Sequence, residues 1–185
     1  MTAGTYVKLG QCTALASFLF GTLILVLFYF TYWDALFLLG YGFIAFTAFI
    51  NLIVLIALVI KCFSDKQNRK KLLMTGGVML LNVPIMLGYL WIMVVLLNTI
   101  RITFVNSTQT PLTNVKIIGC EGGNIEQLAV GESETVWVGI PSDCGISIEY
   151  LTDGKQKKET VAGYLTPLGG RKADYKIGGK NNAIF

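Results

Sequence analysis

The sequence predicts a membrane protein in which three transmembrane α-helices are followed by an extracytoplasmic all-β domain. Three observations lead to this fold class. Hydrophobic residues fill 54% of the 185 positions, more than in an ordinary soluble domain. The long apolar runs are confined to the first hundred residues, and each is long enough to cross a bilayer. Beyond residue 100 the pattern changes to short alternating segments between turn residues, which is typical of β-strands.

Three apolar runs define the expected helices, at about residues 9–33, 35–61 and 72–99. Each exceeds the roughly 20 residues that cross about 30 Å of hydrocarbon at about 1.5 Å per residue. A cleaved signal peptide is the alternative interpretation of the first run. Its apolar core is longer than the usual ~7–15 residues, however, and no charge precedes Lys8. We therefore expect an uncleaved anchor and a transmembrane domain at residues 1–100.

A short basic loop, expected at residues 62–71, predicts the orientation of the chain. Short loops rich in Lys and Arg stay in the cytoplasm, because these charges are costly to move through a bilayer. The N-terminus would then be cytoplasmic, and the chain beyond about residue 101 would be periplasmic or extracellular. We expect a bacterial inner membrane. The residues of the loop that carry this topology signal are Lys66, Arg69, Lys70 and Lys71.

The net charge of +4 comes entirely from the membrane part. Six basic and two acidic residues precede residue 101, whereas nine of each lie from residue 101 onward. The excess of positive charge is therefore explained as a topology signal, and a nucleic-acid partner is not expected.

Small residues recur along one side of the first helix at spacings of four, three and four. This spacing places them on one stripe, where a neighbouring helix can approach closely. The alternative is chance, since Gly and Ala are ordinary in an apolar segment. The residues of this expected helix-packing face are Gly10, Ala14, Ser17 and Gly21.

Polar residues inside the second and third runs predict a contact between these two helices. Asn51 and Asn82 lie at the same depth, about 15 Å from the basic loop, and Thr47 precedes Asn51 by one turn. An amide in hydrocarbon needs a partner, so we expect an interhelical polar contact. A transport site is the alternative, but the runs contain no Asp, Glu, Lys, Arg or His in the membrane interior that could relay ions. Pro84 should bend the third helix, either as a static kink or as a hinge.

Residues 101–178 are expected to form a β-sandwich with an immunoglobulin-like architecture, although the Trp and Cys spacing of antibody domains is missing. Seven short segments alternate between apolar and polar residues, and Asp153-Gly154 is a strong signal for a two-residue hairpin. Asn106-Ser107-Thr108 fits a glycosylation sequon, which matters only in a eukaryotic secretory pathway. Residues 179–185 should be a flexible tail whose Ile184-Phe185 end docks on a partner.

The predicted topology separates the four cysteines into two compartments. Cys120 and Cys144 both fall in the outer domain, where a disulfide would close a loop of ~25 residues and add roughly 3 kcal/mol. Two free thiols are the alternative. Cys12 and Cys62 fall at the cytoplasmic side and are expected to act as apolar side chains, with acylation as the alternative.

The sequence contains no histidine and no motif of a known catalytic, phosphate or dinucleotide site. We therefore expect no enzyme activity, no catalytic residue, no cofactor and no metal. The expected function is that of an accessory or scaffolding subunit in a larger membrane protein complex. Its expected partners are the lipid bilayer and other integral membrane subunits, in a hetero-complex rather than a homo-oligomer. The alternatives are a sensor or receptor that binds a ligand or peptide through the β domain, and a small oligomeric transporter or channel.

Overall fold

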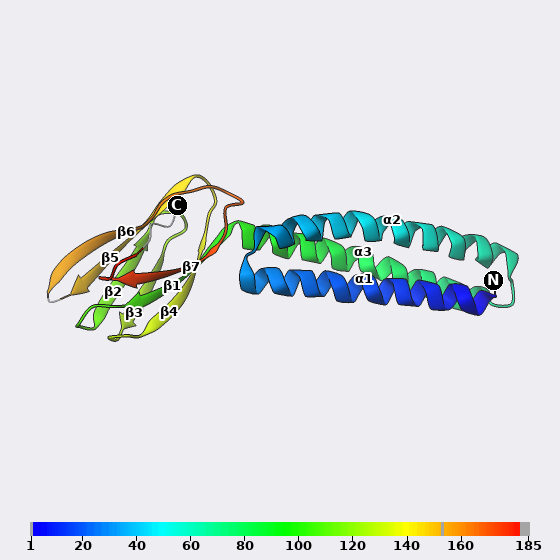
Figure 1. Ribbon diagram of the computed structural model, residues 1–185, viewed down its shortest axis with the longest axis horizontal. Helices are drawn as coiled ribbons and strands as arrows, with labels where there is room; N and C mark the ends of the chain where they lie inside the picture. Colours follow the sequence, from blue (N-terminus) through cyan, green and yellow to red (C-terminus); the bar gives the residue numbers. More distant parts are fainter. Residues whose placement is uncertain (1, 153, 182–185) are drawn as a thin grey trace. The chain divides into compact units, whose positions relative to one another are not determined.

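The computed structural model describes residues 2–152 and 154–181, and its chain divides into two compact units, residues 1–93 and 94–185 (Figure 1). Within the described residues, three long helices precede seven strands, which confirms the predicted order of a helical part and a β-rich part. The three helices are long and apolar enough to cross a membrane, judged by length and composition. The hairpin prediction at Asp153 and the docking prediction for Ile184-Phe185 lie outside the described residues.

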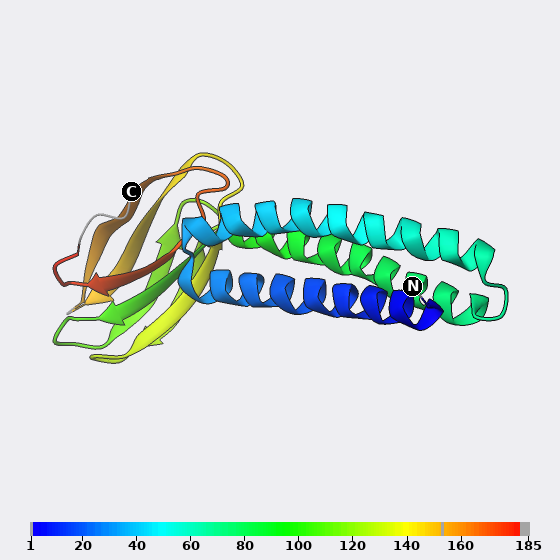
Figure 2. The same cartoon turned by 45° about the vertical axis from the view of Figure 1, so that its right-hand side comes forward.

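The helices are α1 (Ala3–Thr31), α2 (Asp34–Ser64) and α3 (Arg69–Leu97), and they run side by side in both views (Figures 1 and 2). The turn between α1 and α2 is short because Tyr32 takes the left-handed conformation, with a φ of 51°, and its N–H caps Phe28 O at 2.8 Å. Only Tyr32 and Trp33 therefore connect the two helices.

The basic segment differs from the expected loop at residues 62–71. The helices extend into it from both sides, so that only residues 65–68 connect α2 to α3. The predicted helices ended where the apolar runs meet the first charged residues. Lys and Arg are good helix formers, however, so the helices continue through them. Asp65 also favours a tight turn, since its Oδ1 accepts hydrogen bonds from the backbone N and the Nδ2 of Asn68, both at 3.2 Å. These bonds lower the pKa of Asp65, with a further contribution from Lys61.

The helices are best packed at the end where α2 turns into α3. The backbones of α1 and α2 approach each other more closely than either approaches that of α3. A buried apolar cluster joins the first half of α1 to the second half of α2 and the first half of α3. We call it the membrane core, and it consists of Ala14, Val54, Leu58, Cys62, Leu72 and Met79.

The β unit contains two sheets on a common core, with a three-stranded sheet in the order β4-β1-β7 and a four-stranded sheet in the order β3-β2-β5-β6. β1 pairs in parallel with β7, and the other pairs are antiparallel. Tyr150 from one sheet and Phe104 from the other are among the largest buried side chains. The strands are β1 (Thr99–Asn106), β2 (Leu112–Ile118), β3 (Gly123–Leu128), β4 (Ser133–Gly139), β5 (Cys144–Thr152), β6 (Lys155–Leu165) and β7 (Lys172–Ile177).

The strand order differs from that of an immunoglobulin constant domain. There the first strand lies in a four-stranded sheet and both sheets are antiparallel. Here β1 is the central strand of the smaller sheet, and the last strand pairs with it in parallel. Alternation along a strand predicts which face is buried but not which strand lies beside it, so sequence periodicity carried no signal for this pairing.

Two short segments of the β unit follow the ends of strands, one between β5 and β6 and one after β7. Thr152 pairs with Lys155, and Gly154 has a φ of 70°. The first part of the expected tail is held to β7, because Asn181 Oδ1 accepts from the N–H of Lys176, and its Nδ2 donates to Lys176 O, both at 2.7 Å.

Candidate functional site

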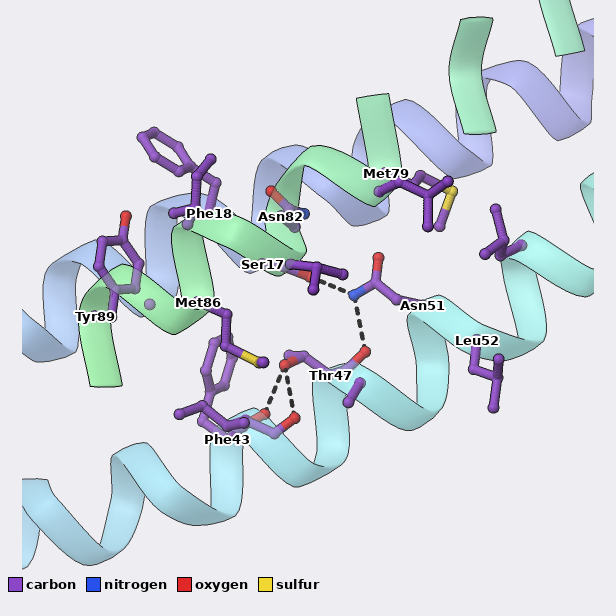
Figure 3. A pocket seen from close by; sticks show the side chains of 17 residues that line it. Ser17, Phe18, Phe43, Thr47, Asn51, Leu52, Met79, Asn82, Met86 and Tyr89 are labelled. Carbon is purple, nitrogen blue, oxygen red and sulfur yellow. Dashed lines mark hydrogen bonds between the residues drawn. The ribbon is translucent and has the colours of Figure 1, made fainter. Parts of the chain in front are cut away.

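A cavity of about 300 Å³ lies between the three helices, and we call it the membrane cavity (Figure 3). Its walls are mainly apolar, with Phe43, Leu55, Met79 and Met86 among them. Mainly apolar pockets with a few convergent polar groups are the usual form of small-molecule sites. The polar residues that line the membrane cavity are Ser17, Thr47, Asn51, Asn82 and Tyr89.

The small residues of α1 face the other two helices. A Cβ atom at Gly10 would lie 2.6 Å from Thr75 Cγ2 and 3.0 Å from Leu58 Cδ1, so that any larger residue would force these side chains to shift. A Cβ atom at Gly21 would lie 3.3 Å from Cε2 of Tyr89. Gly10 and Ala14 are buried, whereas Ser17 and Gly21 are half-buried and line the membrane cavity. The stripe thus lies where α1 meets both neighbours.

The amides of Asn51 and Asn82 both donate to α1. Asn51 Nδ2 donates to Ser17 Oγ at 2.9 Å and to Thr47 O at 2.8 Å (Figure 3). Asn82 Nδ2 donates to Ala14 O at 3.0 Å. We expected the two amides to join α2 to α3 directly, and the structure instead places the acceptors on α1. The depth of each amide could be counted from the sequence, but its direction around the helix axis could not. Small residues at Ala14 and Ser17 let the amides approach α1 closely.

The hydroxyl of Thr47 bonds within its own helix, to Phe43 O at 2.7 Å and Ile44 O at 3.3 Å. Its contribution to the polar contact is therefore its backbone carbonyl, which accepts from Asn51. Pro84 lies inside α3, which is continuous from Arg69 to Leu97, and the bend at this position stays a prediction.

A second interhelical polar pair was missed by sequence reasoning. Tyr89 OH and Thr22 Oγ1 are 2.5 Å apart, and Thr22 also donates to Phe18 O at 2.8 Å. A hydroxyl in an apolar segment needs a partner. Matching depths were the available signal, because Thr22 lies nine residues before the end of α1 and Tyr89 eight residues before the end of α3.

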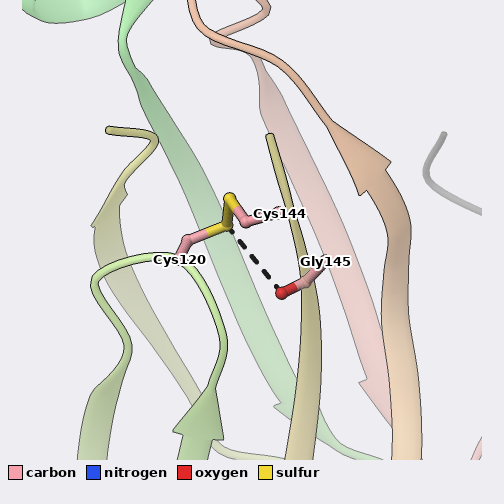
Figure 4. The surroundings of a disulfide bond; sticks show 3 residues. All are labelled: Cys120, Cys144 and Gly145. Atoms are coloured by element: carbon pink, nitrogen blue, oxygen red, sulfur yellow. Dashed lines mark hydrogen bonds between the residues drawn. A yellow bond between two sulfur atoms is a disulfide. The ribbon is translucent and has the colours of Figure 1, made fainter. Parts of the chain in front are cut away.

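The predicted disulfide between Cys120 and Cys144 is confirmed, with an S–S distance of 2.04 Å (Figure 4). It joins the turn after β2 to the first residue of β5, with a sequence separation of 24. A loop of this length corresponds to a stabilisation of roughly 3 kcal/mol in the chain-entropy model. Cys12 is an exposed and Cys62 a buried free thiol.

The β unit contains a carboxylate cluster that the sequence did not indicate. Glu159 on β6 accepts hydrogen bonds from Tyr150 OH, from Tyr175 OH at 2.9 Å and from the N–H of Gly178 at 3.1 Å. Tyr150 belongs to the same sheet as Glu159, whereas Tyr175 belongs to the other sheet. Glu159 therefore joins the two sheets along the side where β6 and β7 lie. Burial raises the pKa of both tyrosines above the ordinary value of 10.0, and the hydrogen bond to Glu159 raises it further.

This cluster predicts a loss of stability in alkali. The folded state holds the two phenolic protons more tightly than the unfolded state does. The contribution of these tyrosines to the free energy of unfolding is therefore fully present below pH 10 and falls as the pH rises above that value. We expect the variant with both Tyr150→Phe and Tyr175→Phe to be less stable than the natural protein at pH 7. Between pH 9 and 11, however, its free energy of unfolding should fall by less than that of the natural protein. Urea unfolding of the protein in detergent at several pH values measures this slope. Equal slopes for the variant and the natural protein would contradict the assignment.

A double-mutant cycle tests the polar contacts of α1. We expect Asn51→Leu and Ser17→Ala to be coupled by about 0.6–1.7 kcal/mol, the range measured for interhelical hydrogen bonds, because they remove the two ends of one bond. The control cycle combines Ser17→Ala with Asn82→Leu, whose amide donates to Ala14 O instead. That pair should be additive within about 0.5 kcal/mol in detergent unfolding. Equal coupling in both cycles would mean that the assignment of bonds is wrong.

The sequence matches no protein-family model, and no similar curated protein or solved structure was found. The class of this protein therefore has to be described from its own structural features. It has three apolar helices that are suited to crossing a membrane and a disulfide-bonded unit of two sheets. Its function has to be argued from these features.

Proposed function

We propose that this protein is a non-enzymatic, integral-membrane accessory or scaffolding subunit of a larger membrane protein complex, and that it presents its β unit as a small β-sandwich on the outer side. The observation that carries the proposal is the way in which α3 enters the β unit. A subunit that displays a domain to its partners needs a membrane anchor that continues into that domain, and the last turn of α3 belongs to the β unit.

The attachment is made by the last residues of α3, which belong to the β unit itself. Only Asn98 separates α3 from β1. The N–H of Gly170 donates to Leu97 O at 2.6 Å, the N–H of Ile140 donates to Asn98 O at 2.8 Å, and the N–H of Leu168 donates to Asn98 Oδ1 at 3.1 Å. These five residues form what we call the α3 junction. It supplies partners for carbonyls that would otherwise be unsatisfied at the end of a helix.

Two features support an outer location of the β unit and a cytoplasmic N-terminus, in a bacterial inner membrane. The Cys120–Cys144 disulfide favours an oxidising compartment such as the periplasm. The basic residues Lys66, Arg69, Lys70 and Lys71 lie in or next to the turn between α2 and α3, and the positive-inside rule places this turn in the cytoplasm. The proposed partners are the bilayer and other integral membrane subunits.

This topology predicts which lysines react from outside the cell. A membrane-impermeant amine reagent applied to intact cells should label Lys155 or Lys180, because both lie in the β unit, and should leave Lys70 unlabelled. Mass spectrometry of the modified peptides measures the labelling, and permeabilised cells provide the control in which Lys70 also reacts. Labelling of Lys70 in intact cells would overturn the proposed orientation.

Mass spectrometry of the native complex, extracted in mild detergent, tests the subunit proposal. We expect the protein to be recovered with other integral membrane proteins in a fixed stoichiometry. A solitary monomer would contradict the proposal. A homo-oligomer without other polypeptides would also contradict it, and would favour a small transporter or channel.

The α3 junction also favours a second candidate, a sensor or receptor whose β unit binds a ligand or peptide. Because the end of α3 is built into the β unit, a ligand that shifts the loop containing Leu168 and Gly170 would act directly on the last turn of α3. A conformational signal needs a ligand that binds two states differently. Ligand-dependent crosslinking between cysteines introduced in α1 and α3 would distinguish this function from scaffolding.

A further inference from the structure

We propose that the membrane cavity binds a single lipid-like molecule, an apolar chain that carries one hydroxyl group. The proposal rests on the placement of the helices in a membrane, but not on a role in a complex. Asn51 lies 17 residues after the start of α2 and 13 residues before its end, so the cavity is at the depth of the hydrocarbon. A ligand that reaches it comes from the bilayer.

The membrane cavity lies next to the membrane core. Leu58 and Leu72 are fully buried in the membrane core, and Met79 is the one core residue that also lines the cavity. Beyond Met79 the cavity walls are half-buried or exposed. Protein interiors are close-packed, and an empty space of this size loses the dispersion contacts of its walls. The packing therefore favours an occupant.

The volume suits a small ligand or a segment of a chain. The cavity, at about 300 Å³, falls at the lower end of the ~300–1,000 Å³ range of small-molecule sites. A segment of an acyl or isoprenoid chain is narrow enough to enter.

The polar groups of the cavity explain the hydroxyl. Ser17 Oγ, Thr47 Oγ1 and Tyr89 OH already bond to protein atoms, and a cluster of waters would find few partners among apolar walls. Asn51 Oδ1, in contrast, is buried and accepts no hydrogen bond from the described residues. Figure 3 shows this oxygen turned away from the two acceptors that Asn51 Nδ2 reaches. An unpaired amide oxygen in hydrocarbon is costly. Because this oxygen has almost no accessible surface, the Asn51 side chain has to turn slightly toward the cavity, and one hydroxyl donor would then satisfy it.

Photo-crosslinking of the purified protein in a sterol-based detergent tests the proposal. The probe is hexadecanol with a photoreactive diazirine in its chain, and hexadecane with the same diazirine is the matched probe without a hydroxyl. We expect the alcohol to label peptides that contain Met79 or Met86, and excess unlabelled dodecanol to compete. The alcohol should label these peptides about two- to tenfold more than the alkane does, which corresponds to one hydrogen bond.

Three variants complete the experiment. Ala48→Trp places a large side chain in the cavity wall and should abolish the labelling, whereas Ala45→Trp, an exposed position of α2 outside the wall, should leave it unchanged. Asn51→Leu should keep the alkane labelling and remove the preference for the alcohol. Equal labelling of the two Trp variants would overturn the proposal, and so would labelling spread evenly over the outer helix faces, since that indicates non-specific partition of the probe into the detergent shell. In cells, crosslinking of a photoreactive residue at position 48 to another polypeptide would mean that a protein fills the site.

Discussion

Replacing Gly170 by alanine is expected to destabilise the β unit by several kcal/mol, about as much as a severe core mutation. A Cβ atom at this position would lie 2.3 Å from Leu96 O, 2.5 Å from Leu97 O and 2.6 Å from Thr99 O. All three are backbone atoms at the end of α3 and the start of β1, so no flexible side chain can move to make room. The substitution must therefore displace the loop and break the bond from Gly170 N–H to Leu97 O.

Gly163→Ala is the matched control for this prediction. No atom lies within 4 Å of a Cβ built at Gly163, which is exposed on β6, and its backbone does not have a positive φ. This variant should lie within about 1 kcal/mol of the natural protein. Chemical unfolding in detergent, followed through the fluorescence of Trp137 in β4, measures both. If the two glycine variants were equally stable, the close approach at the α3 junction would be wrong.

Replacing Asn106 by leucine is expected to cost about 3 kcal/mol or more in the stability of the β unit. Asn106 is 1% exposed and uses its whole amide. Its Nδ2 donates to Leu128 O and to Thr110 O, both at 3.0 Å, and its Oδ1 accepts from the N–H and the hydroxyl of Thr108 at 2.9 and 2.7 Å. Leucine has about the same size but leaves these groups without partners, and each unsatisfied buried group costs about 1–3 kcal/mol.

Asn124→Leu provides the control, because Asn124 is exposed on β3 and its change should stay within about 0.5 kcal/mol. Equal effects of the two substitutions in the same unfolding measurement would contradict the role of Asn106. The burial of Asn106 also bears on the Asn-Ser-Thr sequon. Its side chain is not accessible in the folded β unit, so in a eukaryotic secretory pathway only unfolded chains would be glycosylated there.

The parts of the fold that could be predicted are those that depend on local sequence. Apolar runs of sufficient length indicated the three helices, and the presence of Cys120 and Cys144 in one β-rich domain indicated their disulfide. Counting residues gave the depth of Asn51 and Asn82. Their partners on α1 could not be predicted, because they depend on how each helix is rotated about its axis.

The carboxylate cluster and the pairing of β1 with β7 depend on contacts between distant residues. Glu159 follows four exposed polar residues on β6, and that pattern indicates a solvated strand. Its contact with Tyr175 exists only because β7 comes to lie beside β1 in the other sheet. Neither strand carries a local signal for this neighbour, so the cluster became visible only in three dimensions.

The parallel pairing of β1 with β7 has a consequence for biogenesis. The 65 residues from Ser107 to Arg171 lie between these two strands, and at about 5–20 residues per second the ribosome needs roughly 3–13 seconds to add them. Throughout that interval α3 is complete, but the edge of β1 that pairs with β7 in the finished protein is still open. Such an edge is a template for pairing with foreign strands. We therefore expect newly inserted chains to need protection by a chaperone at the membrane surface until Ile177 has emerged, and chains that stop before Lys172 to keep an open edge and to aggregate or be degraded.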